Sequence, residues 1–155
     1  MAGPLASGKI KASSKRNKVK IAIVVAEWNE DVTEALYQGA YDSLIENGVK
    51  RDNIIRKNVP GTFELTTGAL WMAEKKEIDA VICLGCVIQG ETPHFDYICQ
   101  AVAYGVTEVS LKTKKTAIFG VLTTLDKKQA LERAGGKYGN KGEEAALTAL
   151  KMLDF

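Results

Sequence analysis

The residues best suited to chemistry gather in the run Gln89-Gly90-Glu91-Thr92-Pro93-His94. It combines a glycine, a carboxylate, a hydroxyl and a histidine where a loop is expected to enter a helix, with Pro93 near the first turn. Free backbone amides and the positive end of the helix dipole favour an anion such as phosphate there. The His94 imidazole ordinarily titrates near neutral pH, so it is the candidate for proton transfer, with a structural histidine as the alternative.

Trp28 lies just past an apolar run, residues 21–26, and is preceded by Glu27, at the point where the chain should leave the core. On the sequence alone, an aromatic side chain packed at a loop is the commoner outcome. The functional alternative is a flat platform for a heteroaromatic ring, which adds about 0.5–1.5 kcal/mol beyond the area buried.

The segment Gly61-Thr62-Phe63-Glu64 follows a second expected strand, residues 53–59. Its glycine lets backbone amides approach a ligand, and Glu64 offers two acceptors for hydroxyl or ring N–H groups. The alternative is a turn whose carboxylate interacts with the positive end of a helix.

A glycine-rich segment, residues 133–142, places Arg133, Lys137 and Lys141 among four glycines. It could bind an anion, although a helix–helix connection with solvated charges is the commoner reading of such a segment. It is not a P-loop, because the required glycine spacing before a Gly-Lys-Ser/Thr ending is missing.

Metal chemistry is not expected. His94 is the single histidine, so one subunit cannot form a multi-histidine site. Cys83 and Cys86 lie three apart within an apolar strand and should point to opposite faces, as buried small hydrophobic side chains. The odd number of cysteines, without a secretory signal pattern, indicates a reduced, cytoplasmic setting.

The 155 residues predict one domain with a substantial core. Residues 1–20 hold six basic and no acidic side chains, so the other 135 residues carry 15 basic and 19 acidic ones, a net charge of −4. We interpret residues 1–19 as a flexible basic arm and residues 20–155 as the single folded domain. Neither nucleic acid nor a membrane is an expected partner of this body.

Strands and helices alternate along the rest of the chain. Strands are expected at residues 21–26, 53–59, 80–87 and 117–122, and helices at 32–45, 65–76, from 93 onward, 127–134 and 143–153. This alternation predicts an α/β three-layer sandwich, in which helices flank a four-stranded, mainly parallel sheet. Ligands of such sheets bind beyond the carboxyl ends of the strands, where all the segments above except residues 133–142 lie.

Taken in order, the motifs resemble those of one family. The runs are Trp28-Asn29, Pro60-Gly61-Thr62-Phe63-Glu64, the stretch from Leu84 to Asp96, Phe119 to Thr124, Gln129 to Gly136, and Gly139-Asn140-Lys141-Gly142. Together they resemble lumazine synthase, the enzyme of the penultimate step of riboflavin biosynthesis. The resemblance covers about Val19 to Leu153 and implies a flavodoxin-like strand order.

The resemblance implies a transferase that needs neither a metal nor an organic cofactor. The amine of 5-amino-6-(D-ribitylamino)uracil would attack the ketone of 3,4-dihydroxy-2-butanone 4-phosphate to give an imine. Elimination of phosphate and ring closure with loss of water would then give 6,7-dimethyl-8-ribityllumazine.

The resemblance also implies roles for individual residues. His94 matches the proton donor, and the phosphate would be bound by Glu91, Thr92 and Arg133. Trp28 matches the aromatic residue that stacks on the uracil ring. Further contacts to the uracil and its ribityl chain are implied for Thr62, Phe63, Glu64, Cys86, Val87, Ile88, Phe119 and Lys141.

The chain departs from the family pattern at two places. Thr66 stands where proline is usual, and Leu125 stands where aspartate usually follows the Thr-Thr pair. Neither replaces a residue with an implied role, so only local loop geometry is affected.

The family implies a homo-oligomer. Its members form pentamers, and in some of them twelve pentamers close into an icosahedral shell of sixty subunits. The site then lies between subunits, so that Arg133, Phe119 and Lys141 would come from the neighbour. The short connection over residues 135–142 favours the shell, and riboflavin synthase is a further implied partner.

Two other classes of protein remain as alternatives. One is a flavin- or lumazine-binding shell protein that has lost catalysis. The other is a generic flavodoxin-like nucleotide binder, against which the acidic run Trp28-Asn29-Glu30-Asp31 after the first strand argues.

Overall fold

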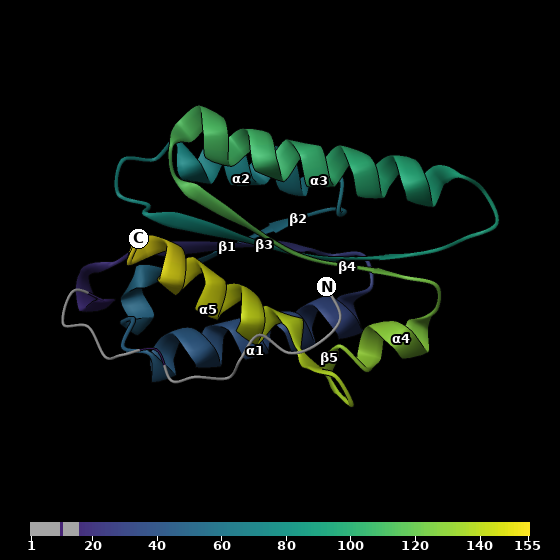
Figure 1. The fold of residues 1–155 in the computed structure, drawn as a ribbon, viewed down its shortest axis with the longest axis horizontal. Helices are drawn as coiled ribbons and strands as arrows, with labels where there is room; N and C mark the ends of the chain where they lie inside the picture. The colour runs from purple at the N-terminus through teal and green to yellow at the C-terminus, as the bar shows by residue number, and fades with distance from the viewer. Residues whose placement is uncertain (1–9, 11–15) are drawn as a thin grey trace.

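Four parallel strands form the central sheet of the computed structural model, which describes residue 10 and residues 16–155. The strands are β1 (Ile21–Ala26), β2 (Ile54–Val59), β3 (Ala80–Ile88) and β4 (Thr116–Thr124). Their order is β2-β1-β3-β4, with every pairing parallel. The prediction of an α/β sandwich with a flavodoxin-like order is therefore confirmed (Figure 1).

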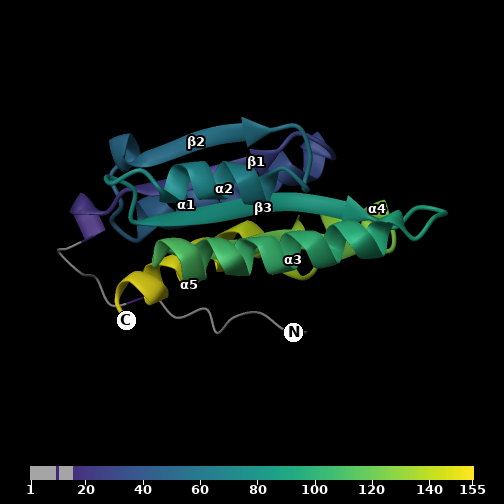
Figure 2. The same cartoon turned by 90° about the horizontal axis from the view of Figure 1, so that it is seen from above.

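Helices cover both faces of this sheet. One face carries α2 (Leu65–Ala73) and α3 (His94–Thr113), and the other carries α1 (Glu30–Glu46), α4 (Lys127–Leu131) and α5 (Lys141–Leu153). Figure 1 shows these three layers from the side, and Figure 2 shows α2 and α3 lying next to each other above the sheet. Each crossover between parallel strands thus passes through a helix, as short loops alone cannot connect them.

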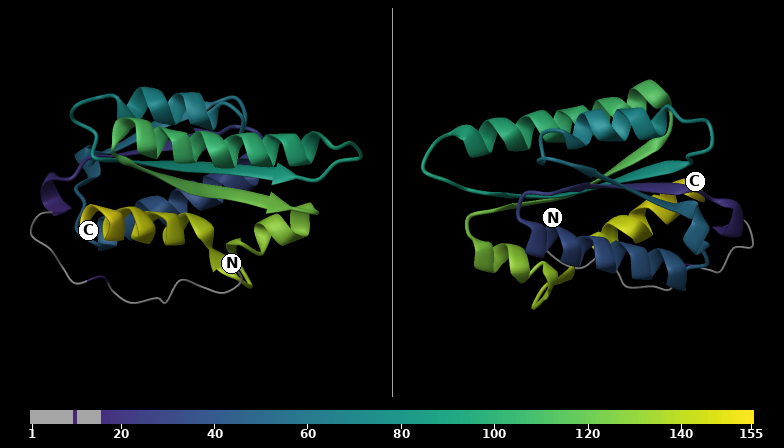
Figure 3. Two further views of the ribbon diagram at one scale, coloured as in Figure 1. Left: turned by 45° about the horizontal axis from the view of Figure 1, so that its top comes forward. Right: turned by 180° about the vertical axis from the view of Figure 1, so that it is seen from behind.

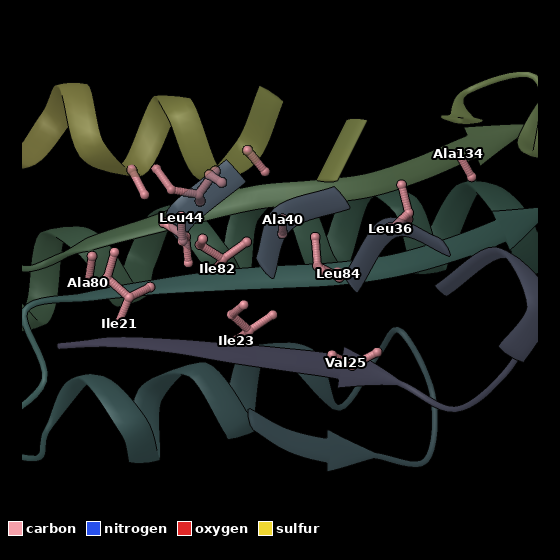
Figure 4. Packing of buried hydrophobic residues seen from close by; sticks show 14 of the residues in the cluster. Ile21, Ile23, Val25, Leu36, Ala40, Leu44, Ala80, Ile82, Leu84 and Ala134 are labelled. Carbon is pink, nitrogen blue, oxygen red and sulfur yellow. The ribbon is translucent and has the colours of Figure 1, made fainter. Parts of the chain in front are cut away.

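The core has two parts, one on each face of the sheet. Side chains of β1 alternate between them: Ile21, Ile23 and Val25 pack under α1 and α5 (Figure 4), whereas Ala22 and Val24 face α2 and α3. All six residues of β1 are at most 1% exposed. Burial on both faces explains why this strand is a continuous apolar run rather than an alternating one.

The two strand cysteines confirm this alternation. Cys83 packs in the cluster under α2 and α3, and Cys86 packs in the cluster under α1 and α5. Burial raises the pKa of the Cys83 thiol to about 12 and that of Cys86 to about 11. Both thiols therefore stay protonated at neutral pH and act as small core side chains.

Several element boundaries differ from the prediction. The second strand begins at Ile54, because Arg51–Asn53 form a short 3-10 helix, and α2 ends at Ala73 rather than at residue 76. Helix α4 ends at Leu131, because the following glycine-rich segment forms a small antiparallel hairpin. Its strands are β5 (Ala134–Gly136) and β6 (Gly139–Asn140), visible beside α4 in Figure 3.

The hairpin also decides where α5 starts. The Asn140 side chain accepts the N–H groups of Gly142 and Glu143, and its own amide donates to the Ala35 carbonyl of α1 at 2.8 Å. This cap lets α5 begin at Lys141, two residues earlier than expected. The segment is neither a simple helix–helix connection nor an extended loop.

Part of the predicted basic arm packs on the body. Arg16–Lys18 form a 3-10 helix, and the buried Arg16 guanidinium forms an ion pair with Asp154 at 2.6 Å. Ile10 and Val19 pack against the cluster under α1 and α5. Residues 1–9 and 11–15 lie outside the described residues, so the flexible arm and the boundary at residue 19 stay predictions. None of the described helices is long and apolar enough to cross a membrane.

Candidate active site

A cleft of about 640 Å³ lies at the carboxyl ends of β1, β2 and β3. This is the edge at which parallel α/β sheets bind their ligands. Residues from the loops after β1 and β2 line it, together with the last three residues of β3 and the first turns of α3. They are Trp28, Asn29, Gly61, Thr62, Phe63, Glu64, Cys86, Val87, Ile88, His94 and Ile98.

Backbone hydrogen bonds fix the loops after β1 and β2 to each other. The Glu27 N–H donates to the Val59 carbonyl at 2.9 Å, and the Trp28 N–H donates to the Pro60 carbonyl at 3.2 Å. Trp28 therefore leaves the sheet with its side chain 73% exposed, at the mouth of the cleft. The reading of Trp28 as a packed loop aromatic is wrong in this chain, because the core ends at Ala26.

Gly61 allows two cleft side chains to approach each other. A Cβ at this position would lie 3.0 Å from Glu64 Oε2 and 3.6 Å from Trp28 Cδ1. Glu64 itself stands just before α2 and is exposed, so its carboxylate can accept hydrogen bonds from a ligand. The glycine thus keeps open the space between the aromatic ring and the carboxylate.

The floor of the cleft is the end of β3. The Cys86 carbonyl accepts a hydrogen bond from Asn29 Nδ2 at 3.0 Å and a longer one from Thr62 Oγ1 at 3.5 Å. Since a carbonyl has two lone pairs, these two side chains compete with any ligand for that oxygen. Val87 and Ile88, which are only half-buried, remain the freer candidates for backbone contacts.

His94 begins α3 and reaches the cleft from the opposite side. Its side chain is exposed, and its backbone N–H donates to Thr92 Oγ1 at 3.4 Å. Glu91 and Thr92 are exposed in the preceding loop, next to the cleft lining rather than in it. Together they surround the N-terminus of a 20-residue helix, where backbone N–H groups favour an anion.

Three predicted site residues lie elsewhere. Among the residues described, Phe119, Arg133 and Lys141 do not line this cleft. Phe119 is 41% exposed on the edge strand β4, and Lys141 forms an ion pair with Glu144 at 2.6 Å. The Arg133 guanidinium donates to the Gln129 carbonyl at 3.0 Å and lies 4.8 Å from the centre of the Tyr138 ring.

Sequence reasoning missed two lining residues. Asn29 received no role, although asparagine is one of the few residues that tolerate the left-handed conformation found here between β1 and α1. Ile98, which received no role either, lines the cleft one turn beyond His94. The signal in the sequence was the i, i+4 spacing of His94 and Ile98, which places the two side chains on one face of the helix.

This arrangement can bind a flat polar ring and move a proton next to it. An exposed indole, a carboxylate and an imidazole meet at the strand ends, and no group of three or more potential metal ligands occurs among the described residues. A flavodoxin-like sandwich with such a cleft defines a small-molecule enzyme of the α/β class.

Comparison with known families identifies the kind of enzyme. The model of the 6,7-dimethyl-8-ribityllumazine synthase family matches residues 18–155. The chain belongs to this family, and its activity is that of a lumazine synthase, a transferase of riboflavin biosynthesis. This assignment replaces the alternative of a generic flavodoxin-like nucleotide binder.

Curated relatives agree along nearly the whole length. A 6,7-dimethyl-8-ribityllumazine synthase of Cytophaga hutchinsonii is 65% identical over 95% of this chain and 91% of its own. The enzyme of Porphyromonas gingivalis is 59% identical over 86% and 83% of the two chains. That of Parabacteroides distasonis is 56% identical over 90% and 87%.

Proposed function

We propose that the cleft condenses 5-amino-6-(D-ribitylamino)uracil with 3,4-dihydroxy-2-butanone 4-phosphate to form 6,7-dimethyl-8-ribityllumazine, phosphate and water. The observation that carries the proposal is the meeting of Trp28, Glu64 and His94 in one cleft, although each follows a different strand. A bimolecular condensation gains most from holding its two reactants together in the right geometry.

The pyrimidine substrate lies on the Trp28 side of the cleft. The exposed indole stacks on the uracil ring, and the Glu64 carboxylate accepts hydrogen bonds from ring N–H or ribityl hydroxyl groups. Thr62, Phe63 and the backbone of Val87 and Ile88 border the same space. Cys86 contributes through the position of its carbonyl, which already accepts two side-chain donors.

The second substrate is bound through its phosphate. The loop of Glu91 and Thr92 and the amides that open α3 receive the anion, and Arg133 of a neighbouring subunit neutralises it. His94, next to this loop, transfers protons as the imine forms and phosphate leaves. The sequence contains the groups for each step without a metal or an organic cofactor.

The activity is tested by incubating the purified protein with both substrates and following lumazine absorbance and fluorescence. Formation well above the uncatalysed rate is expected. Product formation no faster than the uncatalysed reaction would instead support a shell protein that binds lumazine or flavin without turnover. Quenching of Trp28 fluorescence by riboflavin would then report that binding.

Variants separate the two halves of the site. Trp28→Ala should raise the KM for the pyrimidine, and Arg133→Ala should raise the KM for the butanone phosphate. An Arg133→Ala enzyme with an unchanged KM would contradict the phosphate role.

The assembly belongs to the same proposal. Arg133, Phe119 and Lys141 lie outside the cleft of their own chain, which supports a pentamer in which neighbours complete each site. The two-residue turn between β5 and β6, without an insertion, favours closure of twelve pentamers into a shell. Light scattering that gives a mass near five or near sixty chains distinguishes these assemblies, and a monomer would contradict the shared site.

The cellular setting follows from the activity and the chemistry of the chain. We expect a cytoplasmic enzyme with reduced cysteines, which passes its product to a riboflavin synthase. Co-purification of the two enzymes from the native source would test that association.

A further inference from the structure

Asn29 connects the Trp28 platform to α1 through an unusual backbone conformation. Its φ of 60° and ψ of 47° lie in the left-handed region, which few residues other than glycine and asparagine adopt. The Asn29 carbonyl accepts the N–H groups of Val32 and Thr33 at 2.9 Å and 3.0 Å, so this residue starts the helix.

The side chain of Asn29 does something other than cap the helix. Asparagine at this position usually accepts an N–H group from the first helical turn. Within the described residues, Asn29 caps no such group. Its Nδ2 instead donates to the Cys86 carbonyl at 3.0 Å, the same oxygen that Thr62 approaches from the other loop. One carbonyl at the end of β3 therefore connects two loops of the cleft.

Trp28 depends on this connection because little else holds it. Its side chain is 73% exposed, and its backbone has one loop hydrogen bond, to the Pro60 carbonyl at 3.2 Å. The turn at Asn29 fixes the peptide group that joins it to Trp28, and with it the backbone from which the indole leaves. A left-handed residue that a side-chain hydrogen bond holds in place beside a binding cleft points to a functional requirement.

We propose that Asn29 is a positioning residue, which holds Trp28 over the cleft by donating its side-chain amide to the Cys86 carbonyl. The inference rests on the proposed function, in which Trp28 stacks on the pyrimidine substrate. Loss of one net hydrogen bond should raise the KM for that substrate about three- to tenfold. The KM for the butanone phosphate should stay within about twofold, since that substrate binds at the other side of the cleft.

Two substitutions separate the amide from the backbone turn. Asn29→Gly keeps the left-handed conformation accessible and removes the donor. Asn29→Asp keeps the size of the side chain but turns a carboxylate oxygen toward the Cys86 carbonyl. Asn47→Asp is the matched control, because Asn47 at the far end of α1 also donates its amide to a backbone carbonyl, that of Ser43, at 2.8 Å.

The test measures the local rotation of the Trp28 indole directly. The chain has two tryptophans, so a Trp71→Phe background leaves Trp28 as the only indole. Time-resolved fluorescence anisotropy of the full-length assembled protein, without substrate, should show faster local rotation of Trp28 in both Asn29 variants and no change in Asn47→Asp. Unchanged rotation in the Asn29 variants would overturn the proposal.

Kinetics on the same variants complete the test. Trp28→Ala tests the stacking role by itself: an unchanged KM for the pyrimidine would contradict the proposed function while leaving the anisotropy result valid. If Trp28→Ala raises that KM and the Asn29 variants do not, Asn29 does not position the platform for binding and the inference is wrong.

Discussion

At the scale of single residues, burial separates the side chains that can do chemistry from those that only pack. Cys83 and Cys86 belong to the strand whose end forms the floor of the cleft. Burial raises the pKa of the Cys83 thiol to about 12 and that of the Cys86 thiol to about 11, so neither forms the nucleophilic thiolate at neutral pH. His94, only a few residues further along, is exposed at a helix start. The imidazole is therefore the group that we propose for proton transfer, and the two thiols serve as small packed side chains.

His94→Ala should lower kcat about 10- to 100-fold, a modest part of the usual gain from general acid–base catalysis, because positioning supplies much of this reaction's acceleration. Steady-state kinetics with both substrates varied measures the change. Gln100→Ala, an exposed position on the same helix outside the cleft, is the control. An unchanged kcat in His94→Ala would exclude the imidazole from the rate-limiting step.

At the scale of elements, a close contact between two helices fixes where α5 begins. Helices α1 and α5 approach so closely that a Cβ at Gly142 would lie 1.8 Å from the Leu36 carbonyl oxygen. The contact is with backbone, which a rotamer change cannot relieve. It brings the start of α5, and with it Lys141, to a fixed place beside α1.

Gly142→Ala should therefore lower the free energy of unfolding by about 3 kcal/mol or more, since insertion into a packed contact forces the backbones apart. The sign of this change in the free energy of unfolding is informative, because a glycine-to-alanine substitution within a helix normally stabilises the helix by about 1 kcal/mol. Thermal unfolding followed by circular dichroism measures the effect. Gly90→Ala, where a Cβ would meet nothing within 4 Å, should change the Tm little. An unaltered Tm in Gly142→Ala would mean that α1 and α5 are not this close.

A second element contact, between α1 and β2, depends on pH. Arg56 hydrogen-bonds Glu34, with one contact at 2.9 Å, and lies 4.3 Å from the centre of the Tyr37 ring. The hydrogen bonds from Arg56 lower the pKa of Glu34 below its ordinary value of 4.5. The contribution to stability is thus complete above about pH 4.5 and disappears as the pH falls through the lowered pKa of the folded state.

Glu34→Gln should lower the Tm by about 1–4 °C at pH 7, because a pair this exposed to solvent contributes at most about 1 kcal/mol. Near pH 3 the difference from the parent should shrink toward zero. Asp42→Asn on the same helix is the control, since the Asp42 carboxylate accepts a hydrogen bond from neutral Gln38. A Tm difference that stays constant from pH 7 to pH 3 would contradict the ionic origin of the effect.

At the scale of the whole molecule, the residues of the proposed site fall into two groups that do not meet within one chain. The cleft holds Trp28, Glu64 and His94, whereas Arg133 lies outside its lining, among the hairpin residues. If neighbouring subunits share each site, two chains with different substitutions can complement each other in a mixed assembly, whereas chains with complete sites of their own cannot.

Co-expression of His94→Ala and Arg133→Ala chains should give a kcat/KM for the butanone phosphate above that of either variant by itself. In a randomly mixed pentamer, about a quarter of the interfaces pair an intact His94 with an intact neighbouring Arg133. The kcat/KM of the mixture for the butanone phosphate should approach that fraction of the parent value. Co-expression of His94→Ala with His94→Gln is the control and should restore nothing. Failure of the first mixture, with both chains shown to co-assemble, would place the two residues in one subunit's site.

The fold could be predicted from local patterns. Local constraints on burial produce the continuous apolar run of β1 and the helical spacing from Val32 to Leu44. A local constraint on backbone conformation places Gly48 after that helix. The hairpin over residues 134–140 could not be predicted, because its pairing depends on the cap of Asn140 and its bond to α1, a contact between residues 105 positions apart. Trp28 was misjudged without its family context, since exposure at a strand end depends on where neighbouring loops run.

The sequence by itself determined the order of strands and helices, the edge of the sheet at which a ligand binds and the residue types collected there. These features follow from periodicity and from side-chain chemistry, which are properties of the chain as written. Only the tertiary structure decided that Asn29 and Thr62 share the Cys86 carbonyl and that Trp28 stands free above it. It also decided that Arg133 lies outside the cleft lining. Such contacts join residues far apart in the chain, and their geometry exists only once the strands are paired and the helices are packed.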